Sequence, residues 1–470
     1  MDSIKLQDFE DRLRHFWEIS GQKIRAIDSC YDFAQGSPVF TRNGKYTTRG
    51  WTEWTEGFVY GSSILQFDAT GEEEFLQLGT ARTVERMAKH VSHIGVHDHG
   101  FNNVSTYGNL LRLMSEGKIA DEPWQRAFYE LALKCSGAVQ AARWTSAGNR
   151  EGFIYSFNGP HSLFADTIRS LRSLGIAHQL DHVLMAENDK KISLLERFLI
   201  HAITTAKYIV FFGEGRDSYD VPGRVVHEAI FNTVDGNFRS PSTQQGFSPF
   251  STWTRGLAWI ITGFAEELEF LASLDDDGIA ETVFSDFGGK ERVESLFRKT
   301  ARATADFYIA NTAVDNIPYW DTGAPCLHRL GDYLNRPADP YNEHEPVDSS
   351  AAAITAQGLM RLGVYLETDG EAVTESTRVS PGALIHPYFQ AGLTILNTLL
   401  EKPYLSTDSS HQGLLLHSVY HRPNGWDSIP EGRSVPCGES SMWGDYHIRE
   451  AALYLQRIVS GDPYYTFWLK

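Results

Sequence analysis

Apolar residues recur at three- and four-residue spacing along most of this chain, and this helical period restricts the possible folds more than any other feature. In residues 191–212, for example, Leu194, Leu195, Phe198 and Leu199 fall on one face of a helix. Similar apolar stripes run through residues 5–20, 57–68, 73–92, 104–115, 124–142, 161–175, 252–273, 290–311, 349–366, 387–400 and 440–458. The pattern predicts about a dozen helices and little β structure.

Short polar residues mark the start of two of these helices. Thr70 precedes the segment that begins near Phe75, and Asp348 precedes the run that begins at Ala351. Side chains of this kind accept hydrogen bonds from the free backbone N–H groups of a helix start. Both residues are therefore expected to act as N-caps.

Long loops rich in glycine, proline and asparagine separate the helices. Loops of such length usually carry function, and they cover residues 213–225, 232–251, 312–347, 367–386 and 402–439. No shift in composition and no flexible linker divides the chain, and the recurring sequence period of a solenoid is not visible. We therefore predict one all-α domain over residues 1–470, a closed (α/α) toroid whose long loops form a cleft.

The charge of the chain excludes several classes of partner. The sequence has 42 Lys and Arg residues against 60 Asp and Glu residues, a formal net charge of −18, and no local basic strip. Such a chain repels nucleic acid, and an acidic substrate needs a locally compensated pocket. The aromatic content is high, with 11 Trp residues, and indole rings suit stacking against sugars.

Cysteine usage and hydropathy indicate the compartment. The four cysteines are scattered without a CxxC pair, which indicates neither a disulfide scaffold nor a zinc knuckle. The first residues are charged and lack the apolar segment of a secretion signal. No apolar run approaches the roughly 20 residues of a membrane-spanning helix. We therefore expect a cytoplasmic protein with no membrane partner.

A cluster of histidines surrounds the first candidate catalytic carboxylate. His90, His93, His97, Asp98 and His99 lie within ten residues, which raises the possibility of a metal site. Their spacing does not match the i, i+4 pairs with which one helix face usually binds a metal. We therefore expect no metal and interpret Asp98 as a carboxylate at the edge of a cleft, with an ordinary N-cap as the alternative.

The second candidate carboxylate follows a Gly-Pro pair. Gly159 and Pro160 end a loop, and the following helix is expected to hold Asp166 in its first turns. The helix dipole favours an acid there for structural reasons alone. A desolvated carboxylate beside a second one is, however, how a general acid is made. Asp98 and Asp166 are therefore the candidate catalytic pair.

Aromatic and cationic residues accompany these carboxylates. Trp51 and Trp54 are three residues apart at a helix start, and Arg255 and Trp259 are one turn apart on the helix that begins near Ser251. A guanidinium can bind a carboxylate with two parallel hydrogen bonds. The structural alternative for Arg255 is an ion pair within the protein, for example with Glu266.

Several motifs together resemble those of the unsaturated glucuronyl hydrolases, glycoside hydrolase family 88. In order, they are WTEGF, HDHGF, FADT, QGFSPFSTWTRGLAW, IPYWDTGAP, VDSSAAAI, GLLLHSVYH and WGDY, from about residue 50 to the C-terminus. The resemblance implies an (α/α)6 barrel. It also implies an enzyme that releases a 4,5-unsaturated glucuronic acid from the non-reducing end of lyase-generated oligosaccharides.

The resemblance also implies roles for ten residues. Asp166 resembles the general acid/base that protonates C4 of the sugar, with a pKa raised by its neighbour Asp98, which is the second catalytic carboxylate. Phe157 stands where the family pattern has a tryptophan, which leaves the choice of oligosaccharide open. The positions that match substrate-binding residues are Trp54, His97, Phe157, His227, Gln245, Trp253, Arg255 and Trp259.

The expected partners are small unsaturated uronic-acid oligosaccharides, without a cofactor, and the chain is expected to be a monomer or a homodimer. Three alternatives remain open at this point. The toroid could belong to an unsaturated rhamnogalacturonyl hydrolase, bind carbohydrate without catalysis, or carry a metal-dependent hydrolase. The family resemblance favours the glucuronyl hydrolase, because the STWTRGLAW and DSSAAA segments are closer to that group.

Overall fold

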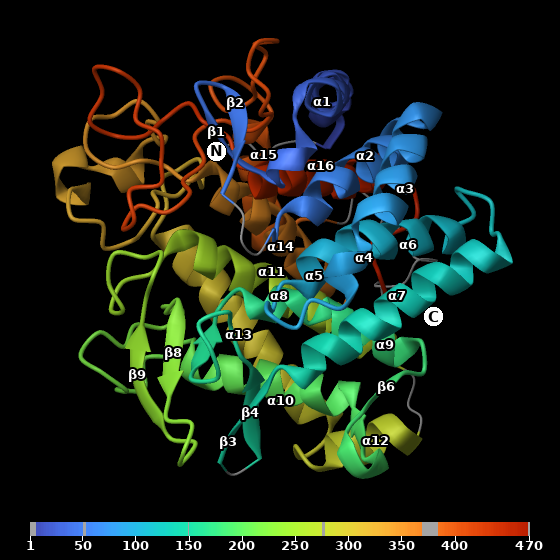
Figure 1. Ribbon diagram of the computed structural model, residues 1–470. Helices are drawn as coiled ribbons and strands as arrows, with labels where there is room; N and C mark the ends of the chain where they lie inside the picture. Colours follow the sequence, from blue (N-terminus) through green and yellow to red (C-terminus); the bar gives the residue numbers. More distant parts are fainter. Residues whose placement is uncertain (1–5, 50–52, 149, 275–277, 369–383, 469–470) are drawn as a thin grey trace.

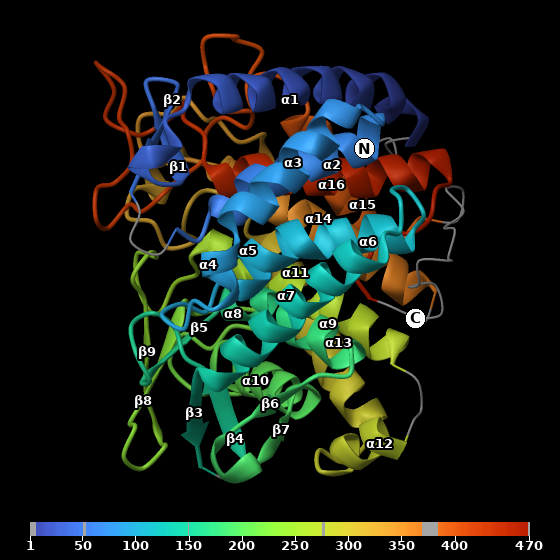
Figure 2. The ribbon, with the colours of Figure 1, turned by 45° about the vertical axis from the view of Figure 1, so that its right-hand side comes forward.

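The predicted helices are arranged as two concentric rings in the computed structural model of the protein (Figures 1 and 2). The structure describes residues 6–49, 53–148, 150–274, 278–368 and 384–468. The inner ring contains α2 (Glu56–Thr70), α5 (His99–Asn103) continued by a π-helical turn (Val104–Gly108) and α6 (Asn109–Ser115), α8 (Thr167–Ser170) with α9 (Arg172–Gln179), α11 (Thr254–Ser273), α14 (Ser349–Glu367) and α16 (Met442–Ser460). The chain alternates between the two rings along its length.

The outer ring covers the inner one. It contains α1 (Glu10–Cys30), α3 (Glu73–Arg86), α7 (Pro123–Ala142), α10 (Leu194–Tyr208), α13 (Lys290–Ala310) and α15 (Pro387–Leu399). Two short helices, α4 (Ala88–Val91) and α12 (Gly278–Ser285), lie beside α3 and α13. This arrangement is the (α/α) toroid expected from the sequence.

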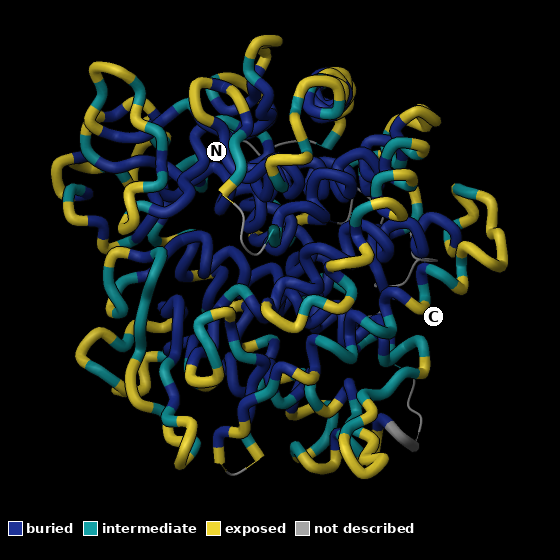
Figure 3. Tube along the Cα trace, in the orientation of Figure 1, coloured by how far each residue is buried: buried dark blue, intermediate teal, exposed yellow. Residues whose placement is uncertain are grey.

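Burial explains why each helix belongs to its ring. Nearly every residue of α11 and α14 is buried, because apolar and small side chains occur around these helices and charged ones such as Glu266 are paired inside the ring. By contrast, α1 buries only one stripe, which includes Leu13, Phe16 and Trp17. Figure 3 shows the same division, with buried residues in the centre and exposed ones at the rim. Each inner helix packs against the next, and α16 packs against α2 to close the ring.

Four small antiparallel sheets lie in the loops. They are β1 (Pro38–Arg42) with β2 (Lys45–Thr48), β3 (Trp144–Ala147) with β4 (Glu151–Ile154), β5 (Ser162–Phe164) with β8 (Glu228–Phe231) and β9 (Phe238–Ser242), and β6 (Val183–Met185) with β7 (Lys191–Ser193). Short 3-10 turns occupy Leu6–Phe9, Phe33–Gln35, Glu187–Asp189, Leu327–Leu330 and Tyr333–Asn335. In Figure 1 the loops of the last third of the chain lie on the same side as the β8–β9 hairpin.

The structure corrects two local predictions. Residues 161–175 are not one helix, because Ser162–Phe164 pair with β8 as a strand and α8 begins only at Thr167. Thr70 is not the N-cap of α3, because it is the last residue of α2, which Gly71 ends in the left-handed conformation (φ 73°). The loop expected at 367–386 lies mostly outside the described residues.

The other predicted cap is confirmed. The Asp348 carboxylate accepts hydrogen bonds from the backbone N–H groups of Ser350 (3.1 Å) and Ala351 (3.4 Å). Among the described residues, no helix combines the length and the apolar character that crossing a lipid bilayer demands.

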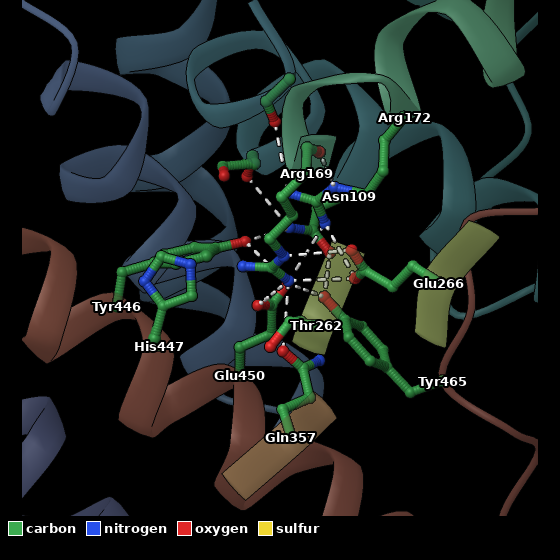
Figure 4. Close-up of polar contacts among 12 residues, drawn as sticks. Asn109, Arg169, Arg172, Thr262, Glu266, Gln357, Tyr446, His447, Glu450 and Tyr465 are labelled. Carbon is green, nitrogen blue, oxygen red and sulfur yellow. Dashed lines mark hydrogen bonds and ion pairs between the residues drawn. The ribbon is translucent and has the colours of Figure 1, made fainter. Parts of the chain in front are cut away.

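A buried ion network joins the inner helices at the centre of the toroid (Figure 4). The Arg169 guanidinium of α8 donates to Glu266 of α11 (3.0 Å from both Nε and Nη2), to Glu450 of α16 (2.6 Å) and to Gln357 of α14 (3.1 Å). Arg172 lies 3.5 Å from Glu266 and 3.6 Å from Glu450. Because charges this deeply buried are stable only when paired, the network holds four inner helices in one arrangement.

Two glycines let neighbouring inner helices touch at the ends that carry the candidate site. A Cβ atom on Gly57 of α2 would lie 2.3 Å from the Asn102 carbonyl oxygen of α5, and one on Gly100 of α5 would lie 2.5 Å from the backbone of Ser170 in α8. In both cases the added Cβ would meet backbone atoms, which cannot move aside as a side chain can. The spacing of α2, α5 and α8 therefore depends on both glycines.

This close approach predicts a specific stability effect. Gly100→Ala should lower the free energy of unfolding by about 1–3 kcal/mol, because the added methyl group forces α5 away from α8. Gly108→Ala on the same inner segment is the matched control, since the nearest atoms to its Cβ would be side-chain atoms of Val104 (3.0 Å) and Phe467 (3.6 Å) rather than backbone atoms. Thermal unfolding of both variants tests this, and equal melting temperatures would contradict it.

Candidate active site

The residues singled out in the sequence lie at the starts of the inner helices. Trp54 precedes α2, Asp98 precedes α5, Asp166 precedes α8, and Arg255 lies in the first turn of α11. The inner-helix starts face one end of the toroid, where their side chains meet. Helix N-termini carry partial positive charge, so this end of a strongly acidic chain can receive an anion.

A cleft of about 1090 Å³ opens at this end. The structure brings nine of the ten predicted site residues to its wall. They are Trp54, His97, Asp98, Phe157, Asp166, Gln245, Trp253, Arg255 and Trp259. His227 does not line it, and Trp51, the other tryptophan of the predicted pair, lies outside the described residues.

His97 joins the two candidate catalytic carboxylates. Its Nε2 atom lies 3.1 Å from Asp166 Oδ1 and 3.9 Å from Asp98 Oδ1. Both aspartates occupy N-cap positions, yet neither side chain accepts a capping hydrogen bond. Asp98 therefore stands at an N-cap position without capping the helix with its side chain, and the carboxylates of both aspartates are free of a capping role.

The electrostatics of this group differ from the sequence-based expectation. Burial raises the pKa of Asp166, but the charge and hydrogen bond of His97, with His227 and Arg255, outweigh burial and leave it below its ordinary value. Burial raises the pKa of Asp98 and outweighs the opposing charge of His97, and the negative charge of Asp166 adds to the rise. The expected raised pKa therefore belongs to Asp98, because the structure places the His97 imidazole against Asp166.

The surroundings of His97 favour its protonated form. Burial alone would lower its pKa, but the negative charges of Asp98 and Asp166 raise it above the ordinary value. Both carboxylates therefore stabilise the protonated imidazole, and the charge of each of the three side chains affects the pKa of the others.

Arg255 is occupied by the protein itself. Its Nη1 donates to Asp348 Oδ2 (3.0 Å) and to the Val419 carbonyl (2.5 Å), and its Nη2 donates to Gln245 Oε1 (2.7 Å) and to the Tyr420 carbonyl (2.8 Å). These bonds use four of the five N–H donors of a guanidinium. In this structure these donors are therefore not available for the two-pronged grip on a substrate carboxylate that the sequence suggests.

The acidic partner of Arg255 is also different from the one considered in the sequence. It is Asp348, whereas Glu266 pairs with Arg169 and Arg172. Arg255 lies between two indoles, 4.6 Å from the Trp253 ring and 4.9 Å from the Trp443 ring. It holds the loop of Val419 and Tyr420 against the start of α11.

His227 supports the cleft from behind. Its Nδ1 accepts hydrogen bonds from the backbone N–H groups of Gln244 (3.0 Å) and Gln245 (3.3 Å). The pKa of His227 is lowered to about 4, chiefly by burial, so its Nδ1 keeps the lone pair that these bonds need. Its ring packs 4.7 Å from that of Trp253. His227 therefore positions the segment that presents Gln245.

Aromatic rings form the wall and floor of the cleft. Trp54 stacks on Trp443 with centroids 5.1 Å apart, and Trp259 is only 2% exposed at the floor, against Phe101 (4.9 Å). Phe157 is 37% exposed and stacks on His97 at 6.0 Å. Flat apolar faces beside carboxylates suit a sugar ring, whose faces are apolar and whose edge is polar.

Sequence reasoning missed part of the wall. Arg49, Tyr420, His421, Asn424 and Trp426 also line the cleft. They belong to the end of a hairpin and to a long loop, neither of which has a helical period. The signal available was the aromatic and cationic run YHRPNGW within a loop otherwise typical of turns.

The histidine cluster does not form the metal site considered from the sequence. His99 Nδ1 contacts Ser136 Oγ (3.0 Å), and its Nε2 contacts the His93 carbonyl (3.1 Å). One member of the cluster, His90, instead joins Glu53 and Glu56, and among the described residues these three bring possible ligand atoms within 4.8 Å of one another. The Lys89 ammonium already pairs with both of these glutamates, so we assign this group as an ion-pair cluster.

The two carboxylates beside His97 predict a measurable change in its titration. Asp98→Asn and Asp166→Asn should each lower the pKa of His97, because each removes a negative charge that stabilises the imidazolium. Nitrogen-15 NMR of histidine-labelled protein measures this pKa. Glu53→Gln, a change at another cleft carboxylate, is the control and should leave the pKa of His97 unchanged. An unaltered His97 titration in both aspartate variants would contradict the role of these carboxylates in stabilising the imidazolium.

Comparison with known proteins gives a consistent result. No family model matches the chain. The chain is 25% identical over 429 residues to the unsaturated glucuronyl hydrolase of Bacillus sp. (strain GL1), covering 90% of this chain and 91% of that protein. It is 23% identical over 441 residues to the unsaturated chondroitin disaccharide hydrolase of Streptococcus pyogenes serotype M1, with coverage of 90% and 86%.

Solved structures match the fold. The crystal structure of the unsaturated glucuronyl hydrolase from Bacillus sp. GL1 superposes with a TM-score of 0.66 at 23% identity, covering 95% of this chain and 97% of that one. An unsaturated glucuronyl hydrolase specific for heparin superposes with a TM-score of 0.67 at 20% identity, covering 96% and 98%. In sequence and in fold, the chain resembles the unsaturated glucuronyl hydrolases over about nine-tenths of its length.

Proposed function

We propose that this protein is a glycoside hydrolase that releases 4,5-unsaturated glucuronic acid from the non-reducing end of small, lyase-generated oligosaccharides. One observation carries the proposal: two carboxylates from adjacent inner helices, Asp98 and Asp166, share the imidazole of His97 in an aromatic-lined cleft. The names of the curated relatives support the same substrate class.

The chemistry begins with a proton transfer to carbon. Asp166, as general acid, protonates C4 of the C4=C5 double bond, and positive charge develops at C5 and the ring oxygen. The Asp166 carboxylate then accepts a proton from a water molecule while the water oxygen adds to C5. The resulting hemiketal opens and releases the next sugar. The glycosidic bond therefore breaks without direct displacement at the anomeric carbon, unlike in the usual glycoside hydrolases with two catalytic carboxyl groups.

The surroundings of Asp166 supply the proton. Its carboxyl group needs to be protonated before reaction, although its pKa is low in the unliganded protein. His97 holds a proton 3.1 Å away, and a uronate arriving in the cleft adds a negative charge that raises the pKa of every nearby acid. Asp98 stabilises the positive charge that develops on the sugar and holds the sugar hydroxyls.

The remaining cleft residues bind the sugar. Trp54, Trp253, Trp259 and Phe157 pack against its ring faces. Gln245 contacts the uronate or the attacking water, and its amide is oriented by the Arg255 guanidinium, which donates to Gln245 Oε1. We assign Arg255 and His227 as positioning residues.

We also propose that the whole chain acts as one domain in the cytoplasm. The first and last inner helices, α2 and α16, pack together, so the ring needs both ends of the chain. All four cysteines are unpaired thiols, including the exposed Cys30, which suits a reducing compartment.

Activity is predicted to be visible as a loss of ultraviolet absorbance. The conjugated double bond of the unsaturated uronate disappears when C4 is protonated, so a panel of lyase-generated disaccharides should lose absorbance with the wild-type chain. Asp166→Asn and Asp98→Asn should lower kcat by roughly 100- to 10,000-fold, the usual contribution of an acid–base group. The control Asp181→Asn changes an exposed aspartate at positive φ (55°), where asparagine fits equally well.

Two outcomes would overturn this function. If no disaccharide loses absorbance, the chain is not this enzyme. If both aspartate variants still bind the sugar with wild-type affinity and the wild type shows no turnover, the toroid is a carbohydrate-binding protein.

The pH dependence tests the role of His97. Because the pKa of His97 is raised, the imidazole keeps the shared proton to a higher pH than a pair of carboxyl groups would. His97→Gln should therefore shift the alkaline limb of the kcat/KM profile to lower pH, in addition to lowering the maximum. The exposed His161→Gln is the control, and an alkaline limb that stays in place in His97→Gln would remove His97 as the proton store.

A further inference from the structure

The cleft has a buried floor and an open mouth. At the floor, His97 and Asp98 are 1% and 6% exposed. At the mouth, Arg49 and Asn424 are exposed and Trp426 is half-buried. On the proposed function, the unsaturated ring has to reach the carboxylates at the floor, so the sugar that follows it lies at the mouth.

Two arginines line this cleft, and they differ in how far their N–H donors are already bonded to the protein. Arg255 is buried, and four of its N–H donors are bonded to protein oxygens. Arg49 forms no hydrogen bond or ion pair to the residues that the structure describes. Its guanidinium stacks over the Trp426 ring at 4.7 Å and over the Tyr420 ring at 5.8 Å.

This stacking holds Arg49 ready for an anion. Aromatic faces fix the plane of a guanidinium without using its N–H donors, which stay at its edge. The edge of a guanidinium matches the oxygens of a carboxylate or a sulfate ester with two parallel hydrogen bonds. Glu53, an acidic residue of the same cleft, is paired with Lys89, so it does not occupy Arg49.

The floor of the cleft cannot play this role. Asp98 and Asp166 repel a further negative charge, and they share a single imidazole. An anionic group on the second sugar is therefore stabilised only toward the mouth, where the Arg49 guanidinium is open to it. A neutral second sugar leaves Arg49 solvated, so it is accepted without loss.

We propose that Arg49 determines substrate specificity at the mouth of the cleft by binding an anionic group, a sulfate ester or a carboxylate, on the sugar that follows the unsaturated uronate. This inference rests on the proposed function. It defines the preferred substrates as oligosaccharides with a second acidic group, in a chain whose net charge would otherwise repel them.

The test compares three unsaturated disaccharides that share the same first ring. Their second sugars are a neutral hexosamine, the same hexosamine with a 6-sulfate, and a uronic acid. Arg49→Gln should raise KM for one or both anionic disaccharides by about 10- to 100-fold, the range expected for lost charge-assisted hydrogen bonds. It should leave kcat unchanged, and KM for the neutral disaccharide should stay within about twofold of the wild-type value.

Two further variants sharpen the comparison. Arg49→Lys keeps the charge without the two-pronged geometry and should give an intermediate KM. Arg42→Gln is the matched control on the same β1–β2 hairpin, where Arg42 is exposed and, among the described residues, donates one long hydrogen bond (3.5 Å), to the Trp426 carbonyl. Added salt should weaken binding of the anionic disaccharides to the wild type more than to Arg49→Gln.

Each outcome decides the proposal. A larger effect with the sulfate or with the carboxylate supports it and identifies the anionic group. An equal rise of KM for all three disaccharides in Arg49→Gln would mean that Arg49 only supports Trp426. An unchanged KM for all three would mean that Arg49 binds no part of the sugar. Either result overturns the proposal. If the wild type hydrolyses none of them, the proposed function fails, and calorimetric binding of the same three sugars to Asp166→Asn, with and without Arg49→Gln, still decides the role of Arg49.

Discussion

The Arg169 guanidinium at the centre of the toroid is the interaction on which the rest of the structure depends. It bonds to three other inner helices through Glu266, Gln357 and Glu450 (Figure 4). Removing one partner of such a buried pair leaves an unpaired charge, at a cost of about 3–5 kcal/mol. Since Arg169 lies three residues after Asp166, the network that closes the ring also fixes the position of a candidate catalytic carboxylate.

The second constraint is the electrostatics of the cleft. A chain with a net charge of −18 is a poor receptor for an anionic sugar unless positive charge is concentrated in one place. The toroid supplies it by turning the N-termini of the inner helices toward one end, where His97 offsets part of the negative charge of Asp98 and Asp166. Arg255 neutralises Asp348 beneath the wall, while Arg49 remains at the mouth.

Much of the fold was predictable from the sequence, because the helical period is repeated in long segments and burial follows it closely. One of the two local errors has a tertiary cause. Residues 162–164 have an apolar run that fits a helix, but pairing with β8 makes them a strand. For the site, motif order identified nine residues of one cleft wall. Arg49 and Trp426 were missed, because loop residues reach the cleft only through the path of the folded chain.

The sequence by itself determined the class of fold, most of the helical segments and the types of residue available for chemistry, since all of these follow from local spacing. Only the tertiary structure decided which charges meet. It paired Arg255 with Asp348 rather than Glu266, placed His97 against Asp166, and so put the raised carboxyl pKa on Asp98. The physical reason is that a pKa and an ion pair depend on distances of a few ångströms between residues far apart in the chain, and sequence spacing contains no such distances.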